Sequence, residues 1–343
     1  MIDLRSDGVT RPTPAMRQAM LDAVVGDDVL GDDPTVNRLQ ALAAERLGKE
    51  AGLFVPSGMM GNLLAVRLFA RHGLAVVAEP RTHLAVCAVA ALAGGNISPV
   101  AGDKFGYMPL DALDAALASD AFGRQAALLC LENSFNGAGG TALTPAYLGA
   151  AADLAHRRGV PVHLDGARLF NAAVALGVDA AELARPADTV MFCVSKGLGA
   201  PVGSLLVGRR ELIAEAAHQR HLCGGAMRQA GLLAAAGIIA LEQMTERLVE
   251  DHANARLLAE GLAQIEGIEI DLELVQTNLI YFDVRRLGVS GAAFEQALSR
   301  AGVASFAAGP ATLRLVTHKD VSRADCLAAL EIIKRTAAEM QQR

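Results

Sequence analysis

Seven short apolar segments in the first 208 residues constrain the fold more than any other feature of the sequence. They do not alternate between polar and apolar side chains, as strands with one solvent-exposed face do. Strands of this kind are buried on both faces, which is typical of a parallel sheet covered by helices. The segments are residues 52–55, 75–78, 97–100, 126–131, 160–164, 190–194 and 204–207.

Helical patterns separate these segments, at residues 60–69, 83–92, 110–118, 145–158 and 167–176. This alternation predicts an α/β fold with a mostly parallel sheet sandwiched by helices. A long helical region then leads into a second set of strands near 268–272, 279–284 and 313–317, with helices near 291–300 and 322–341. We therefore expect a large domain over residues 1–245, including the N-terminal segment, and a smaller C-terminal α/β domain over residues 246–343.

The composition favours small-molecule chemistry. The net charge is −6 and the pI is about 5.8, and no basic run suggests a nucleic-acid partner. Five scattered cysteines form no C-x-x-C pair, so neither a disulfide framework nor a metal site is expected. The sequence shows no hydrophobic signal region at its start and no apolar run of membrane-spanning length, which predicts a cytoplasmic location without membrane contact.

Lys196 follows the apolar segment 190–194 and precedes glycines and a proline that do not continue as a helix. The residues on either side of it in the sequence are mostly apolar or small. Desolvation favours the neutral amine of lysine, and a neutral amine condenses with carbonyl groups to form a Schiff base. A lysine at the surface end of a strand is the alternative that this stretch alone leaves open.

Three other features also follow predicted strands, where ligands bind in such sheets. Residues 55–62 turn from a strand into a helix whose start, at Ser57 and Gly58, could bind an anion. Asp165 follows the strand 160–164, and His83 begins a helix. Together with Lys196 they match what pyridoxal 5'-phosphate requires: an amine, a carboxylate for its ring nitrogen, a phosphate site and a flat side chain beside its ring.

Short motifs are spread along the chain: LRSD (4–7), GDDV with GDDPTVN (26–37), GKEAGLFVPSG (48–58), LEN (131–133), LDGARLFNAAVALG (164–177), CVSKGLGAPVGSLLVG (193–208), MRQAG (227–231), EDHANAR (250–256), QTN (276–278) and RLVTH (314–318). With these motifs the sequence resembles the low-specificity L-threonine aldolases, which are fold-type-I pyridoxal-phosphate enzymes of the β-eliminating-lyase-like superfamily. The resemblance covers nearly the whole chain.

The resemblance implies a retro-aldol cleavage of a β-hydroxy-α-amino acid, such as threonine, allo-threonine or a bulkier analogue, to glycine and an aldehyde. It implies Lys196, His83 and Asp165 as catalytic residues, with Lys196 forming the internal aldimine. The cofactor-binding residues would be Ser57, Gly58, Met59, His83, Asp165, Arg168, Ser195, Lys196 and Arg228. The substrate-binding residues would be Ser6, Arg168, Arg314, Phe135 and Leu30. Such enzymes are homodimers or homotetramers with shared sites, and Arg228 would come from the neighbouring subunit.

Six positions depart from the family pattern: Gly8, Leu30, Met59, Cys87, Phe135 and Ala226. At five of them an apolar or smaller residue replaces a polar one, and Phe135 stands where a histidine near the substrate hydroxyl is expected. Phe135 cannot accept a proton, so His83, a water, or the substrate and cofactor themselves would have to do so. The departures favour a substrate with a larger, more apolar β-substituent, or an α-substituted amino acid. The alternative is that they are neutral substitutions within a threonine aldolase. An amino-acid racemase, a β-eliminating lyase and a non-catalytic member of the fold remain the alternatives.

Overall fold

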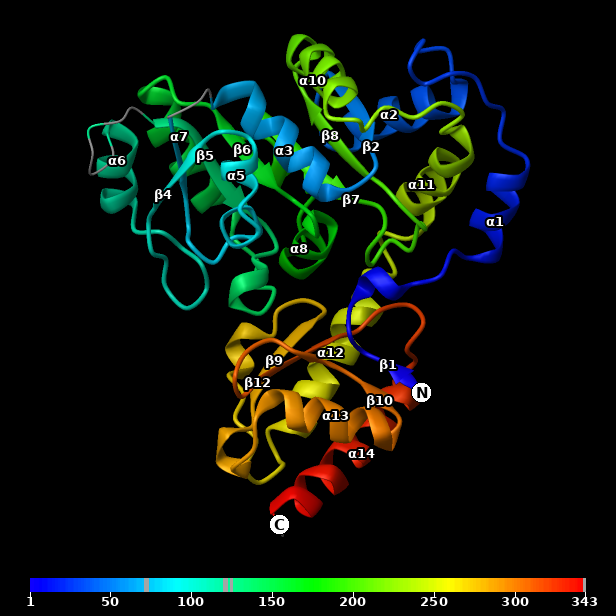
Figure 1. Ribbon diagram of the computed structural model, residues 1–343, viewed down its shortest axis with the longest axis vertical. Coiled ribbons are helices and arrows are strands. Elements are labelled where there is room, and N and C mark those ends of the chain that lie inside the picture. Colours follow the sequence, from blue (N-terminus) through cyan, green and yellow to red (C-terminus); the bar gives the residue numbers. More distant parts are fainter. Residues whose placement is uncertain (71–73, 120–122, 124–125, 342–343) are drawn as a thin grey trace.

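The computed structural model describes residues 1–70, 74–119, 123 and 126–341. Figure 1 shows two bodies, an upper one that contains a seven-stranded sheet and a lower one that contains a three-stranded sheet. Helices cover both faces of the larger sheet, so the predicted α/β class is confirmed. Within the described part of the chain, no helix is long and apolar enough to cross a bilayer.

The large sheet has the strand order β2-β8-β7-β6-β5-β3-β4. All neighbouring pairs from β7 to β4 are parallel, whereas β8 runs antiparallel to both β7 and β2. The sheet is therefore mostly parallel, as predicted. Its strands are β2 (Ala51–Val55), β3 (Ala75–Ala78), β4 (Asn96–Pro99), β5 (Ala126–Glu132), β6 (Val162–Asp165), β7 (Thr189–Cys193) and β8 (Ser204–Gly208).

Two sets of helices bury the two faces of this sheet. One face packs against α3 (Gly58–Phe69), α4 (His83–Val86), α5 (Val89–Leu92) and α10 (Arg210–Leu222). The other packs against α2 (Pro34–Arg46), α6 (Leu110–Ala118), α7 (Pro145–Arg157), α8 (Leu169–Leu176) and α9 (Ala180–Ala184), and α1 (Pro14–Leu21) and α11 (Gly231–Gln243) extend this layer. Because both faces are covered, the strands are apolar throughout, which explains the pattern in the sequence.

The smaller body contains an antiparallel sheet of order β11-β12-β9, formed by β11 (Phe306–Ala307), β12 (Thr312–Val316) and β9 (Leu279–Asp283). Its core packs against α12 (Leu248–Leu262), α13 (Gly291–Ala301) and α14 (Arg323–Gln341). Short 3-10 helices complete the chain: η1 (Asp7–Val9), η2 (Asn136–Ala138), η3 (Leu272–Leu274) and η4 (Arg285–Leu287).

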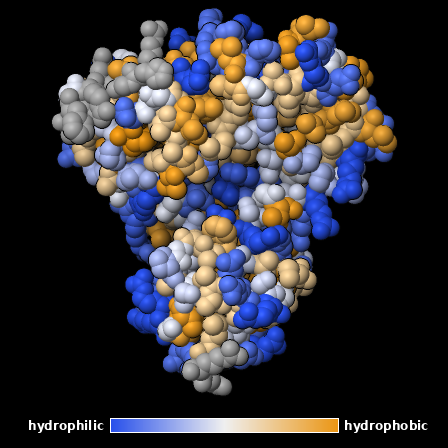
Figure 2. Space-filling model, viewed as in Figure 1, coloured by the Kyte–Doolittle hydropathy of each residue, from blue (hydrophilic) through white to orange (hydrophobic). Residues whose placement is uncertain are grey.

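The N-terminus packs on the smaller body, although the predicted division assigned it to the large domain. β1 (Ile2–Asp3) pairs in parallel with β10 (Val303–Ala304), and Leu4 is buried in the small core. Helix α12 joins the two bodies, because Leu248 at its start packs in the large core and Ala255 packs in the small one. Hydrophilic side chains gather at the waist between the bodies (Figure 2).

Two predicted elements differ in the structure. The helix expected over 83–92 is split into α4 and α5 at Ala88, whose φ of 54° is left-handed and cannot continue a helix. The strand expected over 268–272 is reduced to a single bridge between Glu269 and Asp283. Asp271 instead accepts the backbone N–H of Glu273 and caps η3, so the local turn competes with the strand.

Candidate active site

A cavity of about 370 Å³ lies beyond the carboxyl ends of β2, β6 and β7. This is where ligands bind in open α/β sheets. Of the site residues expected from the sequence, the structure brings seven together in the wall of this cavity. They are Ser57, Gly58, Met59, His83, Asp165, Ser195 and Lys196.

Lys196 is half-buried in the turn that follows β7. Its carbonyl oxygen accepts the N–H of Gly199 at 2.8 Å and the hydroxyl of Thr10 at 3.1 Å. The same turn ends at Gly203, whose φ is +104° and where a Cβ would lie 2.3 Å from a ring carbon of Phe54. The backbone around the lysine is therefore held from several sides, and only glycine fits at its end.

Asp165 ends β6 with its side chain almost fully buried at the cavity wall. The Nδ2 of Asn62 donates to one carboxylate oxygen at 2.6 Å, and the N–H of Ala167 donates to the other at 3.1 Å. Two N–H donors suit a charged carboxylate. Asp165 can therefore present a negative charge to a cation in the cavity.

Helix α3 begins at the cavity, where Ser57 is its N-cap. The Ser57 side chain accepts the N–H of Met60, and its carbonyl accepts that of Gly61, so the amides of Gly58 and Met59 at the helix start are available to an anion. A Cβ at position 58 would come within 3.0 Å of the sulfur of Cys193. Glycine at this position allows the helix to begin close against β7.

His83 is partly buried at the start of α4. Burial lowers the pKa of its imidazole from the ordinary 6.5, so the ring is neutral at pH 7. Glu132, at the end of β5, accepts the backbone N–H of His83 at 2.6 Å and that of Asn136 at 2.8 Å. Burial and the nearby Asp165 raise the pKa of Glu132 to about 8. This buried carboxyl group thus holds the histidine segment against the edge of the sheet.

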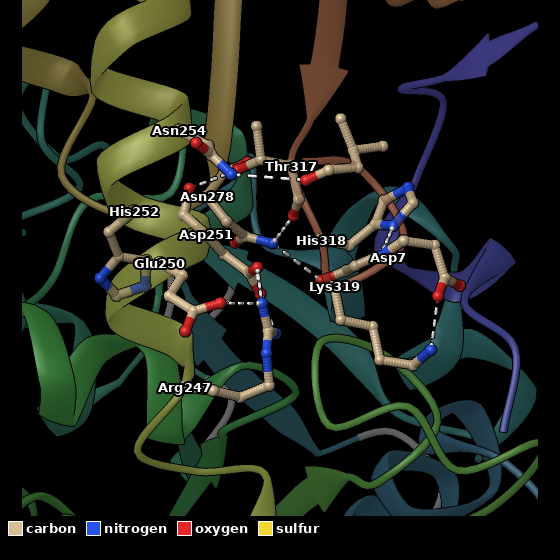
Figure 3. Close-up of polar contacts among 12 residues, drawn as sticks. Asp7, Arg247, Glu250, Asp251, His252, Asn254, Asn278, Thr317, His318 and Lys319 are labelled. Atoms are coloured by element: carbon tan, nitrogen blue, oxygen red, sulfur yellow. Dashed lines mark hydrogen bonds and ion pairs between the residues drawn. The ribbon is translucent and has the colours of Figure 1, made fainter. Parts of the chain in front are cut away.

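Arg168 is not part of the cavity wall, and its guanidinium is paired with Asp7. Nε and one Nη of Arg168 each donate to a carboxylate oxygen of Asp7 at 2.7 Å, and both residues are buried. Asn278 donates to Asp7 at 3.2 Å and to the carbonyl of Thr317 at 3.0 Å (Figure 3). The pair therefore links the N-terminal segment, the large body and the small body.

Two residues expected at the substrate, Ser6 and Arg314, contact the N-terminal segment, of which Gly8 lines the cavity. Ser6 accepts the N–H of Gly8 through its hydroxyl at 3.1 Å. Arg314, on β12, donates to the carbonyl of Arg5 at 3.1 Å, and its guanidinium lies over the ring of Phe306. Neither side chain is part of the cavity wall in the single chain.

Three other expected residues lie away from the cavity of this chain. Phe135 is buried, with Arg81 over its ring, and its ring carbons leave no room for a Cβ at Gly106. Leu30 is 75% exposed and borders a separate pocket beside Ala226. The Arg228 side chain is 71% exposed and pairs with Asp27 at 2.8 Å. Of the six departures from the family pattern, Gly8 and Met59 lie in the cavity wall.

Comparison with known proteins shows the family of the chain. Residues 3–285 match the family model described as beta-eliminating lyase. The low-specificity L-threonine aldolase of Escherichia coli K12 is 44% identical, over 94% of this chain and 95% of that protein. Low-specificity L-threonine aldolase 1 of Arabidopsis thaliana is 40% identical, over 99% of this chain and 98% of that protein.

The chain belongs to the beta-eliminating lyase family and to its low-specificity threonine aldolase group. The solved structure of Leishmania major threonine aldolase shares its fold, with a TM-score of 0.82 at 19% identity over 98% of this chain and 100% of that one. A Sphingomonas wittichii serine palmitoyltransferase also shares it, with a TM-score of 0.78 at 18% identity over 99% of this chain and 88% of that one. Since enzymes of different names have this fold, the fold alone does not determine the reaction.

Four residues near the cavity were not predicted as site residues from the sequence: Asp7, Asn62, Glu132 and His163. Asp7 and Glu132 are charged residues within the motifs LRSD and LEN, which was a signal that they are not ordinary surface side chains. His163 precedes Asp165 by two residues, so the two side chains share a face of one strand. For Asn62 the only signal was its place in the first turns of α3.

Proposed function

We propose that this protein is a pyridoxal-phosphate-dependent aldolase that cleaves a β-hydroxy-α-amino acid to glycine and an aldehyde. One observation carries the proposal: the amine of Lys196 and the carboxylate of Asp165 share one cavity with the start of α3. Its relatives, at 40–44% identity over nearly the full chain, are named low-specificity threonine aldolases, which supports the choice of reaction.

The residues of the cavity fit the cofactor. Lys196 would bind its aldehyde carbon covalently, and Asp165, which already accepts two N–H donors, would pair with the protonated ring nitrogen. The amides of Gly58 and Met59, with Ser57 beside them, would bind the phosphate at the positive end of α3. When bound, pyridoxal phosphate supplies an electron-accepting ring that stabilises negative charge at the substrate Cα.

Arg168, Arg314 and Ser6 would bind the substrate carboxylate. Hydrogen bonds from these guanidinium groups would fix the orientation of the carboxylate. That orientation decides which bond at Cα stands perpendicular to the cofactor ring and breaks. Asp7 would hold Arg168 in place, because it uses two of the guanidinium nitrogens and leaves the third for the substrate.

Two exposed residues would complete the site of a neighbouring subunit. Arg228 and Leu30 lie on the surface of the single chain, on the segments that carry the MRQAG and GDDV motifs. In a homodimer, or in a tetramer built from dimers, Arg228 would approach the cofactor phosphate of the partner and Leu30 its substrate. The partner subunit would thus supply Arg228 and Leu30, which the cavity of one chain does not contain.

His83 would accept the hydroxyl proton of the substrate, since burial keeps its imidazole neutral at pH 7. A base works only in its neutral form, so kcat/KM for threonine should rise with pH through the pKa of His83 and level off before neutrality. We expect the turning point below pH 6.5. In His83→Asn this turning point should disappear, measured as log kcat/KM between about pH 5 and pH 8. An unchanged profile in the variant would assign the proton to a water or to the substrate itself.

Product analysis tests the proposed reaction directly. The purified protein, loaded with pyridoxal phosphate, should convert L-threonine or L-allo-threonine to glycine and acetaldehyde, and phenylserine to glycine and benzaldehyde. L-Alanine and L-serine are the matched controls. D-Alanine from L-alanine would indicate a racemase and pyruvate from L-serine a β-eliminating lyase, and either product in the absence of glycine formation would contradict the aldolase assignment.

A further inference from the structure

A line of buried side chains runs from Asp165 away from the cavity. Asn62 donates to Asp165 at 2.6 Å, its Oδ1 lies 3.0 Å from Nε2 of His163, and Nδ1 of His163 lies 3.0 Å from Oγ1 of Thr189. All four residues are at most 1% exposed. Asn62 borders the cavity, whereas His163 and Thr189 do not.

The secondary structure places these four residues next to one another. His163 and Asp165 are two positions apart on β6 and therefore lie on one face of the sheet. Thr189 is the register partner of His163 on the neighbouring strand β7. Asn62 comes from α3, which lies so close to the sheet that a Cβ at Gly61 would be 2.5 Å from Cγ of Met191. This close approach brings the short asparagine side chain to both β6 residues.

The chemistry of the groups sets the direction of each hydrogen bond. An ionised Asp165 only accepts, so the NH2 group of Asn62 must face it and the amide oxygen must face His163. Nε2 of His163 must therefore carry a proton. In the neutral ring Nδ1 is then an acceptor, and the hydroxyl of Thr189 can donate to it. Burial lowers the pKa of His163 to about 4, which agrees with a neutral ring.

We propose that His163 and Thr189 are positioning residues that orient the Asn62 amide and thereby hold the Asp165 carboxylate toward the ring nitrogen of the cofactor. The two ends of a side-chain amide have nearly the same shape, so packing alone does not choose between them. A flipped Asn62 would point its oxygen at the carboxylate and repel it. By donating to Nδ1, the hydroxyl of Thr189 stabilises the tautomer of His163 that carries its proton on Nε2, and this N–H holds the amide oxygen of Asn62. This inference rests on the proposed binding of pyridoxal phosphate.

The test compares two cofactors on the apoprotein: pyridoxal phosphate and its 1-deaza analogue, in which carbon replaces the ring nitrogen. Both can react with Lys196, but only the first can pair with Asp165. The wild-type protein should bind pyridoxal phosphate about tenfold or more tightly than the analogue, as expected for a hydrogen bond to a charged group. The ratio of the two dissociation constants, measured by absorbance titration, is the readout.

In Thr189→Val and His163→Leu this ratio should fall by about threefold or more, because the carboxylate is no longer held toward the ring nitrogen. Thr189→Ser keeps the hydroxyl and should retain the wild-type ratio. Thr141→Val is the matched control, since Thr141 is equally buried but donates to the carbonyl of Phe105, and it should leave the ratio unchanged. Thr189→Val is close to isosteric, so it decides the question if His163→Leu does not fold.

Equal weakening of both cofactors in Thr189→Val, with an unchanged ratio, would overturn the inference, because a merely structural contact affects the two alike. A wild-type ratio near one would instead show that Asp165 does not pair with the ring nitrogen. That result would contradict the proposed cofactor geometry itself. The two failures are therefore distinguishable.

Discussion

Replacing Lys196 with alanine should abolish the covalent attachment of the cofactor and lower kcat by on the order of 10⁴-fold or more, as removal of a nucleophilic residue does in other enzymes. Lys196 is the amine in the wall of the cavity described above. The backbone carbonyl of Lys196 accepts hydrogen bonds from Gly199 and Thr10, which the alanine variant keeps. The turn should therefore stay folded, and the drop in kcat should come from loss of the amine. The measurement combines single-turnover kinetics with the visible absorption band of the loaded protein and its resistance to dialysis.

Lys196→Arg is the control for charge in this experiment. The guanidinium places a positive charge in the cavity that contains Asp165, but it stays protonated and cannot form a Schiff base. It should therefore be as inactive as Lys196→Ala. If either variant kept a visible band that survives dialysis, together with near wild-type turnover, the assignment of Lys196 would be wrong.

Replacing Asp7 with alanine should destabilise the protein by about 3–5 kcal/mol, since it leaves the guanidinium of Arg168 buried without its partner. The two side chains are joined by two hydrogen bonds of 2.7 Å, and both are buried. The free energy of unfolding, from urea denaturation of the loaded protein at pH 7, is the measurement. KM for the amino-acid substrate should also rise, because Arg168, the proposed binding residue for the substrate carboxylate, would lose the side chain that holds it.

Asp3→Ala is the matched control in the same N-terminal segment. Asp3 also binds an arginine through two hydrogen bonds, to Arg5 at 2.9 and 2.6 Å, but this pair is exposed. An exposed pair contributes about 0–1 kcal/mol, so the control should be nearly neutral. Equal effects of the two substitutions would show that burial of the Asp7 pair is not what makes it important.

The same pair sets an expected response to acid. Arg168 keeps the pKa of Asp7 well below its ordinary value, against the opposing effect of burial. A carboxyl group with a lowered pKa in the folded state stabilises the fold above its unfolded pKa and loses that contribution as the pH falls. Wild-type stability should therefore drop below about pH 4, and the difference from Asp7→Ala should narrow there.

The apolar runs along the chain were enough to predict the strands of the large sheet. All seven strands were expected within a few residues of their observed bounds, because strands buried on both faces show as continuous apolar runs. Prediction was weaker where a single residue decides the backbone. Ala88 in a left-handed conformation splits one helix, and Asp271 caps a turn where a strand was expected.

The part of the site that follows directly from strand ends was also predictable. Lys196, Asp165 and the turn at Ser57 each follow an apolar run, and the carboxyl ends of such strands meet at one edge of the sheet. Their roles with the cofactor stay a prediction, as do those of His83, Arg168 and Arg314. The residues behind them were not found, since nothing in a local pattern says which buried polar groups will touch.

Sequence by itself determined the α/β class, the family and the chemical groups available at the strand ends, because each depends on residues that are neighbours along the chain. Tertiary structure alone decided that Asp7 engages Arg168, that β1 joins the small body, and that Thr189, His163 and Asn62 line up behind Asp165. These contacts join segments that are distant in sequence, and they exist only once the sheet, α3 and the N-terminus have packed. Lys196 and Asp165 could therefore be predicted from the sequence, whereas the hydrogen bonds of Asn62, His163 and Thr189 behind Asp165 could not.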